Sequence, residues 1–304
     1  ATGSTNMAGI SAYLADNVLI DDAMLLAGLA LLLVGLGFKV AVVPFHAWTP
    51  DVYQGAPTPV VAWMAAGVKA AGFAAMMRVF VLTFGTHVSD WQPAFQMIAA
   101  ATVLVGAVVA VVQTDVKRML AYSSIVHAGF ILVGLQAATD RGNSSVLAYL
   151  AVYALLTVGS FAVVTVVGGT GDSAHGLDSY RGLGQRRPLL AGAFTVLLLG
   201  QAGIPFTGGF VVKLGVLAAA VNAGAYWLAG VAMLAAAVAA FVYLRVLVAM
   251  YLEETPTGSE APAAIPVGAL VVVVVSSAAI LLVGLIPGPL LELARDAVPV
   301  LVAG

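Results

Sequence analysis

Three of the four lysines in this sequence lie inside long apolar runs, at Lys39, Lys69 and Lys213. A charged side chain at the centre of a bilayer is unfavourable by about 2.5–3.5 kcal/mol. The same runs contain no aspartate or glutamate that could pair with the amines. Because burial disfavours the charged form of a lysine, a buried amine can exchange protons near neutrality. The pattern therefore indicates proton handling within a membrane.

Lys39 and Lys213 each lie close to a break in a hydrophobic run. Pro44 follows Lys39, and the sequence GIPFTGG at 203–209 precedes Lys213. Non-helical backbone at membrane depth is tolerated only where protein or a wet cavity surrounds it, and paired breaks are typical of the ion path of a transporter. The two broken runs are five crossings apart and so antiparallel, which is the parity of an inverted repeat. The alternative for each lysine is a side chain that snorkels to the interface.

His127 lies in the middle of another apolar run, in the sequence AYSSIVHAGF. Ser123 is four residues earlier on the same helical face, and Tyr122 is beside that face. A histidine in this setting can accept, donate and relay protons. The alternative is a histidine that bonds to a carbonyl of a neighbouring helix and holds the two helices together.

Four further polar residues flank the two breaks. His46 and Asp51 border the proline-rich stretch PFHAWTPDVYQGAPTP, where they are expected either to fix its turn or to form the cytoplasmic mouth of a path. Gln201 and Thr207 border the second break and are candidates to hold water. We count these four, with Tyr122 and Ser123, as secondary site residues.

Composition restricts the fold class. The chain is 62% hydrophobic and 9% charged with a mean hydropathy of +1.07, whereas soluble domains carry about 25% charged residues. Alternation over ten-residue segments is absent, which excludes a lipid-facing barrel and predicts an all-α polytopic transmembrane bundle. There is no basic cluster suited to nucleic acid, no cysteine, no metal-ligand spacing of histidines and no phosphate or dinucleotide motif. We therefore expect no cofactor and no metal in this chain.

The hydrophobic runs divide the sequence into five segments. The first lacks an initiator Met and a basic signal region, so we expect this chain to be the C-terminal part of a longer polypeptide. Hydropathy alone leaves open whether 188–223 crosses once or twice. The segments are 1–21 as a loop or the end of a preceding helix, 22–85 with the first break and the Lys69 run, 93–252 with the second break near 203–209, 266–287 as the last crossing, and 288–304 as an interfacial tail.

Basic residues between the runs predict the orientation. Lys117 and Arg118 lie in one connection, and Arg181, Arg186 and Arg187 lie in another connection on the same side. Basic loops are typically cytoplasmic, and Arg141 stands almost alone on the opposite side. With a single crossing at the second break, the C-terminus is expected on the non-cytoplasmic side.

Three stretches of the sequence resemble one known family. GFKVAVVPFHAWTPDVYQGAPTPVVAWMAAGVKAAGF, TDVKRMLAYSSIVHAGF and LLGQAGIPFTGGFVVKLGVL are similar to the antiporter-like subunit N of bacterial proton-pumping NADH:quinone oxidoreductase, respiratory complex I. The resemblance covers nearly the whole chain. Its VYQGAPTP block, followed by a lysine-bearing helix, favours subunit N over the sister subunits L and M.

The resemblance implies an antiporter-like fold of about fourteen helices with inverted repeats, of which this chain holds the last eight. Segment 22–85 would end the first repeat and 93–252 would form the second, with one discontinuous helix near 203–209. Lys39 would be the lysine of the first broken helix, Lys69 the central lysine and Lys213 the lysine of the second broken helix, with His127 between the latter two. The glutamate that faces the first lysine in the family has no counterpart here.

The function implied is proton translocation along a hydrated axis of Lys39, Lys69, His127 and Lys213, as part of a translocase whose redox site is not in this chain. FMN, iron–sulfur clusters and quinone would reside in partner subunits, and the neighbours would be subunit M, small membrane subunits and lipids in a bacterial cell membrane. One alternative is a subunit of a multi-subunit cation/proton antiporter. The other is a scaffold whose lysines bind lipid phosphate or partner carboxylates.

Overall fold

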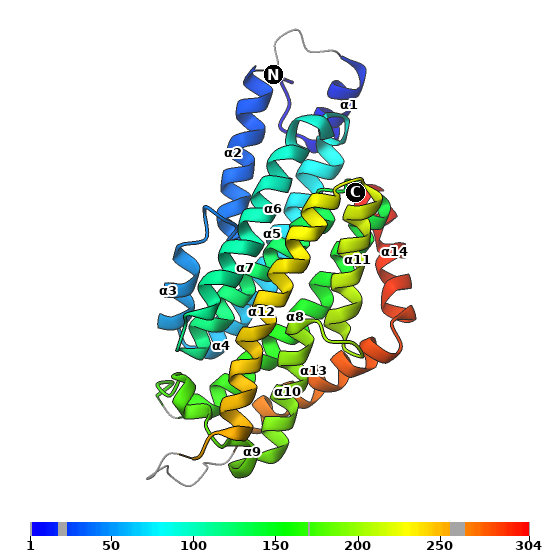
Figure 1. Cartoon of the computed structure of the whole chain (residues 1–304). Coiled ribbons are helices and arrows are strands. Elements are labelled where there is room, and N and C mark those ends of the chain that lie inside the picture. The colour runs from blue at the N-terminus through cyan, green and yellow to red at the C-terminus, as the bar shows by residue number, and fades with distance from the viewer. Residues whose placement is uncertain (1, 18–22, 170, 256–264, 304) are drawn as a thin grey trace.

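Long helices that run side by side form the molecule in this computed structural model, which describes residues 2–17, 23–169, 171–255 and 265–303 (Figure 1). Parts of the segments predicted at 1–21 and 288–304, residue 22 of the segment 22–85 and residue 170 of the segment 93–252 lie outside these ranges. All named elements of the described chain are helical, as the composition predicts. The helices are α1 Met7–Asp16, α2 Ala23–Val40, α3 Trp48–Gly55, α4 Thr58–Trp63, α5 Lys69–Met76, α6 Val88–Val111, α7 Val116–Leu135, α8 Asp140–Gly168, α9 Leu183–Arg186, α10 Pro188–Ala202, α11 Gly208–Asn222, α12 Tyr226–Leu252, α13 Val267–Leu285 and α14 Gly288–Ala303.

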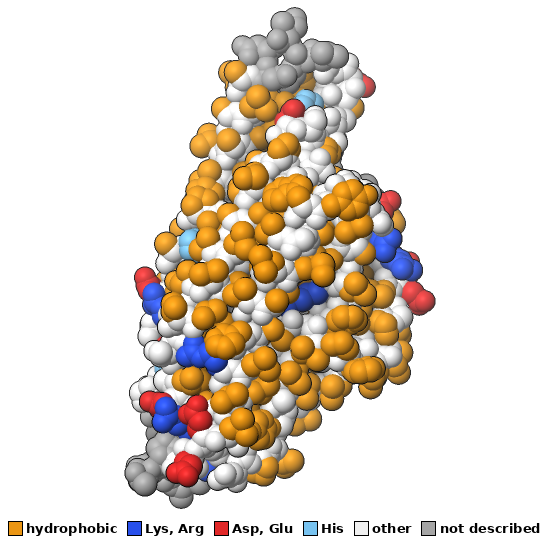
Figure 2. Space-filling view, in the orientation of Figure 1, with side chains coloured by type: hydrophobic (Ala, Val, Ile, Leu, Met, Phe, Trp, Pro, Cys, Tyr) orange, Lys and Arg blue, Asp and Glu red, His pale blue; other side chains and the backbone are white. Residues whose placement is uncertain are grey.

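Seven helices of the described chain are long and apolar enough to cross a membrane. Two shorter apolar helices, α10 and α11, have 15 residues each. Because a helix rises about 1.5 Å per residue, neither can span a hydrocarbon core of about 30 Å alone. The two helices are therefore short enough to be the halves of one discontinuous helix, and a single crossing by the region 188–223 stays a prediction. Hydrophobic side chains cover most of the visible face between the ends of the bundle, as lipid contact requires (Figure 2).

The first break separates α2 from α3. Ala41 has a left-handed φ of 61°, and the Val43–Pro44 peptide bond is cis. The Trp48 indole donates to the Phe38 carbonyl at 3.0 Å, which ties the start of α3 back to the end of α2. The break predicted near Pro44 is thus present, with backbone that is packed in part against the rest of the bundle.

Lys69 lies on a helix with altered winding. A single helical span runs over residues 58–83, and π-helical stretches at Met64–Val68 and Met77–Thr83 flank α5. Lys69 is the first residue after the Met64–Val68 stretch. Inserted π turns are frequent at functional sites because they re-aim the side chains that follow them.

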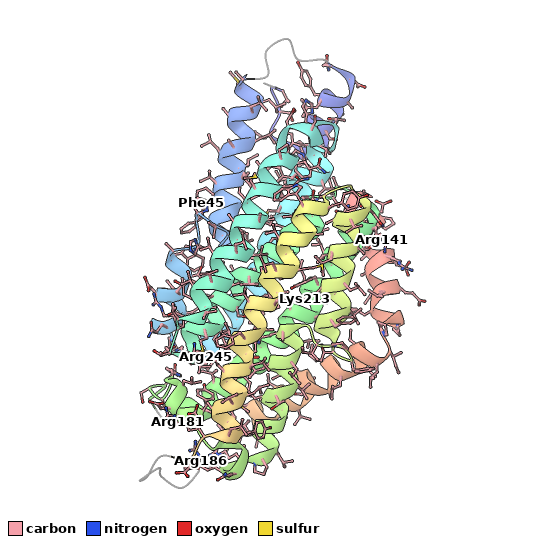
Figure 3. The ribbon with its side chains drawn as sticks, viewed as in Figure 1. Phe45, Arg141, Arg181, Arg186, Lys213 and Arg245 are labelled. Carbon is pink, nitrogen blue, oxygen red and sulfur yellow. The ribbon has the colours of Figure 1, made fainter. Side chains whose placement is uncertain are left out.

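Both connections with basic residues lie at one end of the bundle, as predicted from their charge. The Val116 N–H donates to the His175 carbonyl at 2.8 Å, and the Leu177 N–H donates to the Thr114 carbonyl at 2.9 Å. Arg181 and Arg186 mark this end and Arg141 lies towards the other, with Lys213 between them (Figure 3). Lys117 is not a solvated loop charge, however. Its side chain is only 1% exposed.

The C-terminal part has a bend. α13 ends beside the second break, where Gly284 packs against the backbone of Phe206 and Thr207. α14 then packs on α8 and follows the edge of the bundle (Figure 1). The sequence predicts an interfacial tail for segment 288–304. Its helix packs on the bundle, and its position at the membrane surface stays a prediction.

The two halves of the broken helix approach each other at a glycine. A Cβ built on Gly209 would lie 1.8 Å from the Gly200 carbonyl oxygen, so Gly209→Ala must push α10 and α11 apart. We expect a loss of about 3 kcal/mol or more in stability, measured as thermal unfolding of the purified complex. Gly230→Ala is the matched control, because a Cβ at Gly230 meets nothing within 4 Å. Equal stability of the two variants would contradict the close contact.

Candidate proton-transfer site

α7 is the central helix of the site. All but two of its 20 residues, Arg118 and Tyr122, are buried. A helix that is covered all round belongs to the protein interior and is not a lipid-facing span. Side chains from α5, α8, α11 and α12 converge on its middle, from Ser123 to Phe130.

Lys69 enters this centre from α5. Its side chain is 3% exposed, and its Nζ donates to the Ser124 carbonyl at 2.7 Å and to the Ser124 hydroxyl. The Ser124 hydroxyl shares a second hydrogen bond of 2.8 Å with the Tyr153 hydroxyl. Lys69 Nζ also lies 6.0 Å from the centre of the Tyr153 ring. Hydroxyls can both donate and accept, so this chain of groups can pass a proton away from the amine.

His127 is in the same interior. It is 2% exposed, and its Nδ1 is 2.8 Å from the Tyr149 hydroxyl. Its Nε2 is buried and has no hydrogen-bond partner among the described residues. One ring nitrogen is therefore held by protein and the other is open to a mobile proton carrier.

Lys213 caps the broken helix. Its Nζ donates to the carbonyls of Gln201 and Ala202 at 2.7 and 2.9 Å, which are end groups of α10. The negative end of a helix dipole stabilises a cation there, while burial to 6% exposure disfavours it. The ammonium also lies 5.0 Å from the centre of the Phe130 ring. These opposing influences suit a group that changes its charge.

Gln201 joins the two ends of the site. Its side-chain oxygen accepts from the Ser123 hydroxyl at 2.9 Å, and its side-chain nitrogen donates to the Ser160 hydroxyl at 2.7 Å. The Ser123 hydroxyl is also 2.6 Å from the Tyr243 hydroxyl on α12. Ser123 and Ser124 are neighbours on α7. The hydrogen-bond network of Gln201, beside Lys213, includes Ser123, and the network of Lys69 includes the next residue, Ser124.

A small cavity is lined by residues of both networks. About 10 Å³ of it is open to the centre of a water molecule, which is about the space that one water needs. Its walls supply the polar partners that a buried water requires. The lining polar residues are Ser123, Ser124, Tyr153, Thr157, Ser160 and Gln201.

Lys39 does not join this interior in the structure. It is exposed at the end of α2, although its aliphatic stem reaches Gly72, one turn after Lys69. A Cβ built on Gly72 would lie 3.6 Å from Lys39 Cγ and 2.6 Å from Val40 Cγ1. Lys39 therefore lies beside the Lys69 helix, on its outer side.

The secondary site residues fall into different places. Asp51 forms an ion pair of 2.7 Å with Arg118 at the surface, and the half-buried Tyr122 lies beside the same arginine. His46 is half-buried, and its Nδ1 has no described partner. Thr207 caps α11 by accepting from the Phe210 N–H at 3.4 Å. Ser123 and Gln201 belong to the site; the other four frame it.

Several site residues were not singled out from the sequence. Tyr149, Tyr153 and Thr157 follow one another at intervals of four on α8, so they share one helical face. That spacing of hydroxyl-bearing residues within an apolar run was the available signal. Tyr243 and Ser124 carried no comparable pattern. No cluster of histidine, aspartate or glutamate that could hold a metal ion is found in the described part of the chain.

Loss of the Tyr149 hydroxyl should weaken the site without unfolding it. Tyr149→Phe keeps the stacking of this ring on Phe130 but removes the partner of His127 Nδ1. We expect proton transfer through this chain to fall by about tenfold, the effect of one buried hydrogen bond on the placement of a proton relay. The measurement is proton uptake by vesicles that contain the assembled protein. Tyr226→Phe, an exposed tyrosine on α12, is the control, and equal transport by both variants would contradict a role for His127.

Known proteins share this sequence and architecture. The profile described as NADH:quinone oxidoreductase/Mrp antiporter, TM, matches residues 1–239. NADH-quinone oxidoreductase subunit N of Acidothermus cellulolyticus is 48% identical over 289 residues, which cover 92% of this chain and 54% of that protein. The chain thus spans about half the length of the curated relatives it matches.

Solved structures agree. A chain of respiratory complex I from Thermus thermophilus with bound aureothin is 38% identical with a TM-score of 0.78, and the match covers 90% of this chain and 60% of that one. A chain of the Mrp complex from Dietzia sp. DQ12-45-1b has a TM-score of 0.87 at 24% identity, covering 99% and 63%; this likeness concerns the fold alone. The bundle with two breaks and buried lysines beside the serines of α7 is consistent with these relatives. Because the family model matches most of the chain, the chain belongs to the NADH:quinone oxidoreductase/Mrp antiporter transmembrane family.

Proposed function

We propose that this chain is the proton-conducting part of a subunit N of bacterial NADH:quinone oxidoreductase. Protons pass between Lys69 and Lys213 through the hydroxyls of α7 and α8, with His127 as an intermediate carrier. Lys39 stands at the outer end of this axis. Charge changes along the axis are driven by redox chemistry in partner subunits.

The observation that carries the proposal is the burial of Lys69, His127 and Lys213 within one polar interior. None of them takes part in an ion pair among the described residues. An ammonium group has three donors, and each of these lysines donates to two protein acceptors. A scaffold would saturate such groups, because an unsatisfied buried polar atom is costly. Each lysine therefore keeps one N–H donor that no acceptor of the described chain uses, and such a donor can bind a water that carries protons.

The resemblance extends the proposal to the whole complex. FMN, iron–sulfur clusters and quinone are assigned to partner subunits, and this chain holds no redox site. Its neighbours are subunit M and the small membrane subunits. The protein lies in the bacterial cell membrane with the basic end of the bundle in the cytoplasm and the C-terminus on the opposite side.

Transport in sealed vesicles tests the proposal. Inverted vesicles with the complex that contains this chain should acidify when NADH is added, and the rate should not depend on sodium. A complex whose copy of the chain carries both Lys69→Met and Lys213→Met should oxidise NADH without this subunit's share of pumping. Sodium-dependent proton exchange in the absence of NADH would overturn the proposal in favour of a cation/proton antiporter.

A further inference from the structure

Asp172 occupies an unusual position in the loop after α8. The loop turns back at Gly169 and Gly171, which have φ values of 65° and 105°, and Asp172 itself has a φ of 51°. Left-handed backbone is accessible to aspartate at small cost. The turn brings the carboxylate to the start of the helical span that carries Lys69, more than a hundred residues earlier in the chain.

The Asp172 carboxylate caps that span with two hydrogen bonds. Oδ2 accepts from the Thr58 N–H at 2.7 Å, and Oδ1 accepts from the Thr58 hydroxyl at 2.6 Å. The first N–H groups of a helix have no partner within the helix, and a carboxylate also interacts favourably with the helix dipole. A cap supplied by a distant loop fixes the helix relative to that loop.

Lys117 completes the arrangement. Its Nζ donates to Asp172 Oδ2 at 3.2 Å and to the Ala56 carbonyl at 2.8 Å, so the cation holds both the carboxylate and the chain before Thr58. Lys117 has a side chain 1% exposed, against 28% for Asp172. Because a buried cation without its partner is strongly unfavourable, loss of Asp172 should destabilise Lys117 as well as uncap Thr58. We call Thr58, Lys117 and Asp172 the clamp.

Two other titratable side chains lie near the carboxylate. His175 Nε2 lies 3.1 Å from Oδ1, and the pKa of the buried Tyr180 hydroxyl is raised by burial and by the charges of Asp115 and Asp172. Burial raises the pKa of Asp172, but the hydrogen bonds from Thr58 and Lys117 outweigh it and leave the pKa below its ordinary value of 3.8. Since a lowered carboxylate pKa means that the contribution to stability is lost only as pH falls through that lowered value, the clamp is closed throughout the neutral range.

We propose that the clamp positions the Lys69 helix, so that Asp172 sets the placement of the Lys69 amine against Ser124 without touching the transported proton. The inference rests on the proposed function for its transport readout only. Lys69 lies eleven residues after Thr58 on one helical span, so a shift at the clamp is carried to the amine. A misplacement of a transfer group by about 1 Å can cost a hundredfold in rate.

The absence of cysteine allows the clamp to be observed directly. Val61→Cys is a suitable reporter, because Val61 is 0% exposed and lies on the same helical span as Thr58 and Lys69, so its thiol reacts only when the span moves. In the purified complex, Asp172→Asn should raise the rate of maleimide labelling at this thiol about tenfold, the equivalent of one charge-assisted hydrogen bond. The labelling rate of a control thiol at the exposed Glu254 (Glu254→Cys) should not change in Asp172→Asn. The labelling rate of the reporter should not change in Asp178→Asn, which removes an exposed loop carboxylate. Unchanged labelling in Asp172→Asn would overturn the clamp.

A double variant separates positioning from stability. Asp172→Asn leaves the Lys117 charge buried without its partner, whereas Lys117→Met with Asp172→Asn removes both charges. The double variant should regain normal thermal stability, yet protons pumped per NADH should stay below those of the unmodified complex by most of this subunit's share. Full recovery of pumping in the double variant would overturn the positioning role. If Lys69→Met itself pumped normally, the proposed function would fail, but the labelling result would still decide whether the clamp exists.

Discussion

Lys69→Met should abolish proton transfer through this chain while the complex stays assembled. Methionine matches the length of the lysine stem but has no proton to exchange, and the loss of a positioned transfer group typically costs about a hundredfold or more in rate. Ser124 keeps its hydrogen bond to Tyr153 in the variant. Replacement of a buried charge by an apolar group is often neutral or stabilising, so the unfolding temperature should not fall. Proton uptake by NADH-energised vesicles and thermal unfolding of the purified complex are the two measurements.

The control for this variant is Arg78→Met. Arg78 lies on the same helical span but is exposed, so its removal changes charge without touching the interior. Its pumping should stay normal. A lower unfolding temperature in Lys69→Met with undiminished pumping would show that Lys69 holds helices together and would favour a scaffold.

Lys213→Arg should stop transport although it keeps the charge. A guanidinium can still donate to the Gln201 and Ala202 carbonyls, so the cap on α10 and the discontinuous helix are retained. An arginine does not release its proton in proteins, so the group can no longer alternate between charged and neutral forms. We expect proton transfer through this chain to fall by about a hundredfold, so that proton uptake by the same vesicles loses this subunit's share.

Leu214→Ala is the control for Lys213→Arg. Leu214 is the next residue on α11 and its side chain is 55% exposed, so truncation leaves the interior unchanged. Normal pumping is expected of it. If Lys213→Arg also pumped normally, a fixed positive charge would be sufficient at this position, and proton release from Lys213 would be contradicted.

The main features of the fold could be predicted from the sequence because lipid and backbone hydrogen bonding leave few choices. Apolar runs of about 20 residues must be helices, and Pro44 and the GIPFTGG stretch must interrupt them. The burial of Lys69 and Lys213 follows from the same reasoning, because each lysine lies too far from the ends of its apolar run for its amine to reach the membrane surface. These predictions depend only on local sequence.

The partners in the interior could not be predicted, because they depend on which faces meet. Tyr122 is directly before Ser123, yet it lies with Arg118 on the half-buried side of α7, while Ser123 and Ser124 are fully buried. Lys117 reads as a solvated neighbour of Arg118, and its burial becomes intelligible only with Asp172, which is 55 residues away. In a helix buried almost all round, hydrophobic periodicity does not distinguish the two sides.

Lys39 shows a different limit. Its run and its break predict a buried amine, and the structure has it exposed at the end of α2 with its stem against Gly72. Burial of a side chain at the edge of a bundle depends on what else packs there. Its place in the proton axis therefore stays a prediction, whereas the convergence of Lys69, His127 and Lys213 on α7 is observed.

Protons can move between the hydroxyls of α7 and α8 and the three buried groups only where water completes the path, and ordered solvent in a high-resolution cryo-EM map of the assembled complex shows whether it does. We expect density for water within hydrogen-bond distance of His127 Nε2, of Lys69 Nζ and of Lys213 Nζ, and in the cavity between Ser123 and Ser124. A polar cavity with several partners holds water, whereas an apolar one stays dry. A map in which these nitrogens are well resolved and no solvent lies between them would contradict the account.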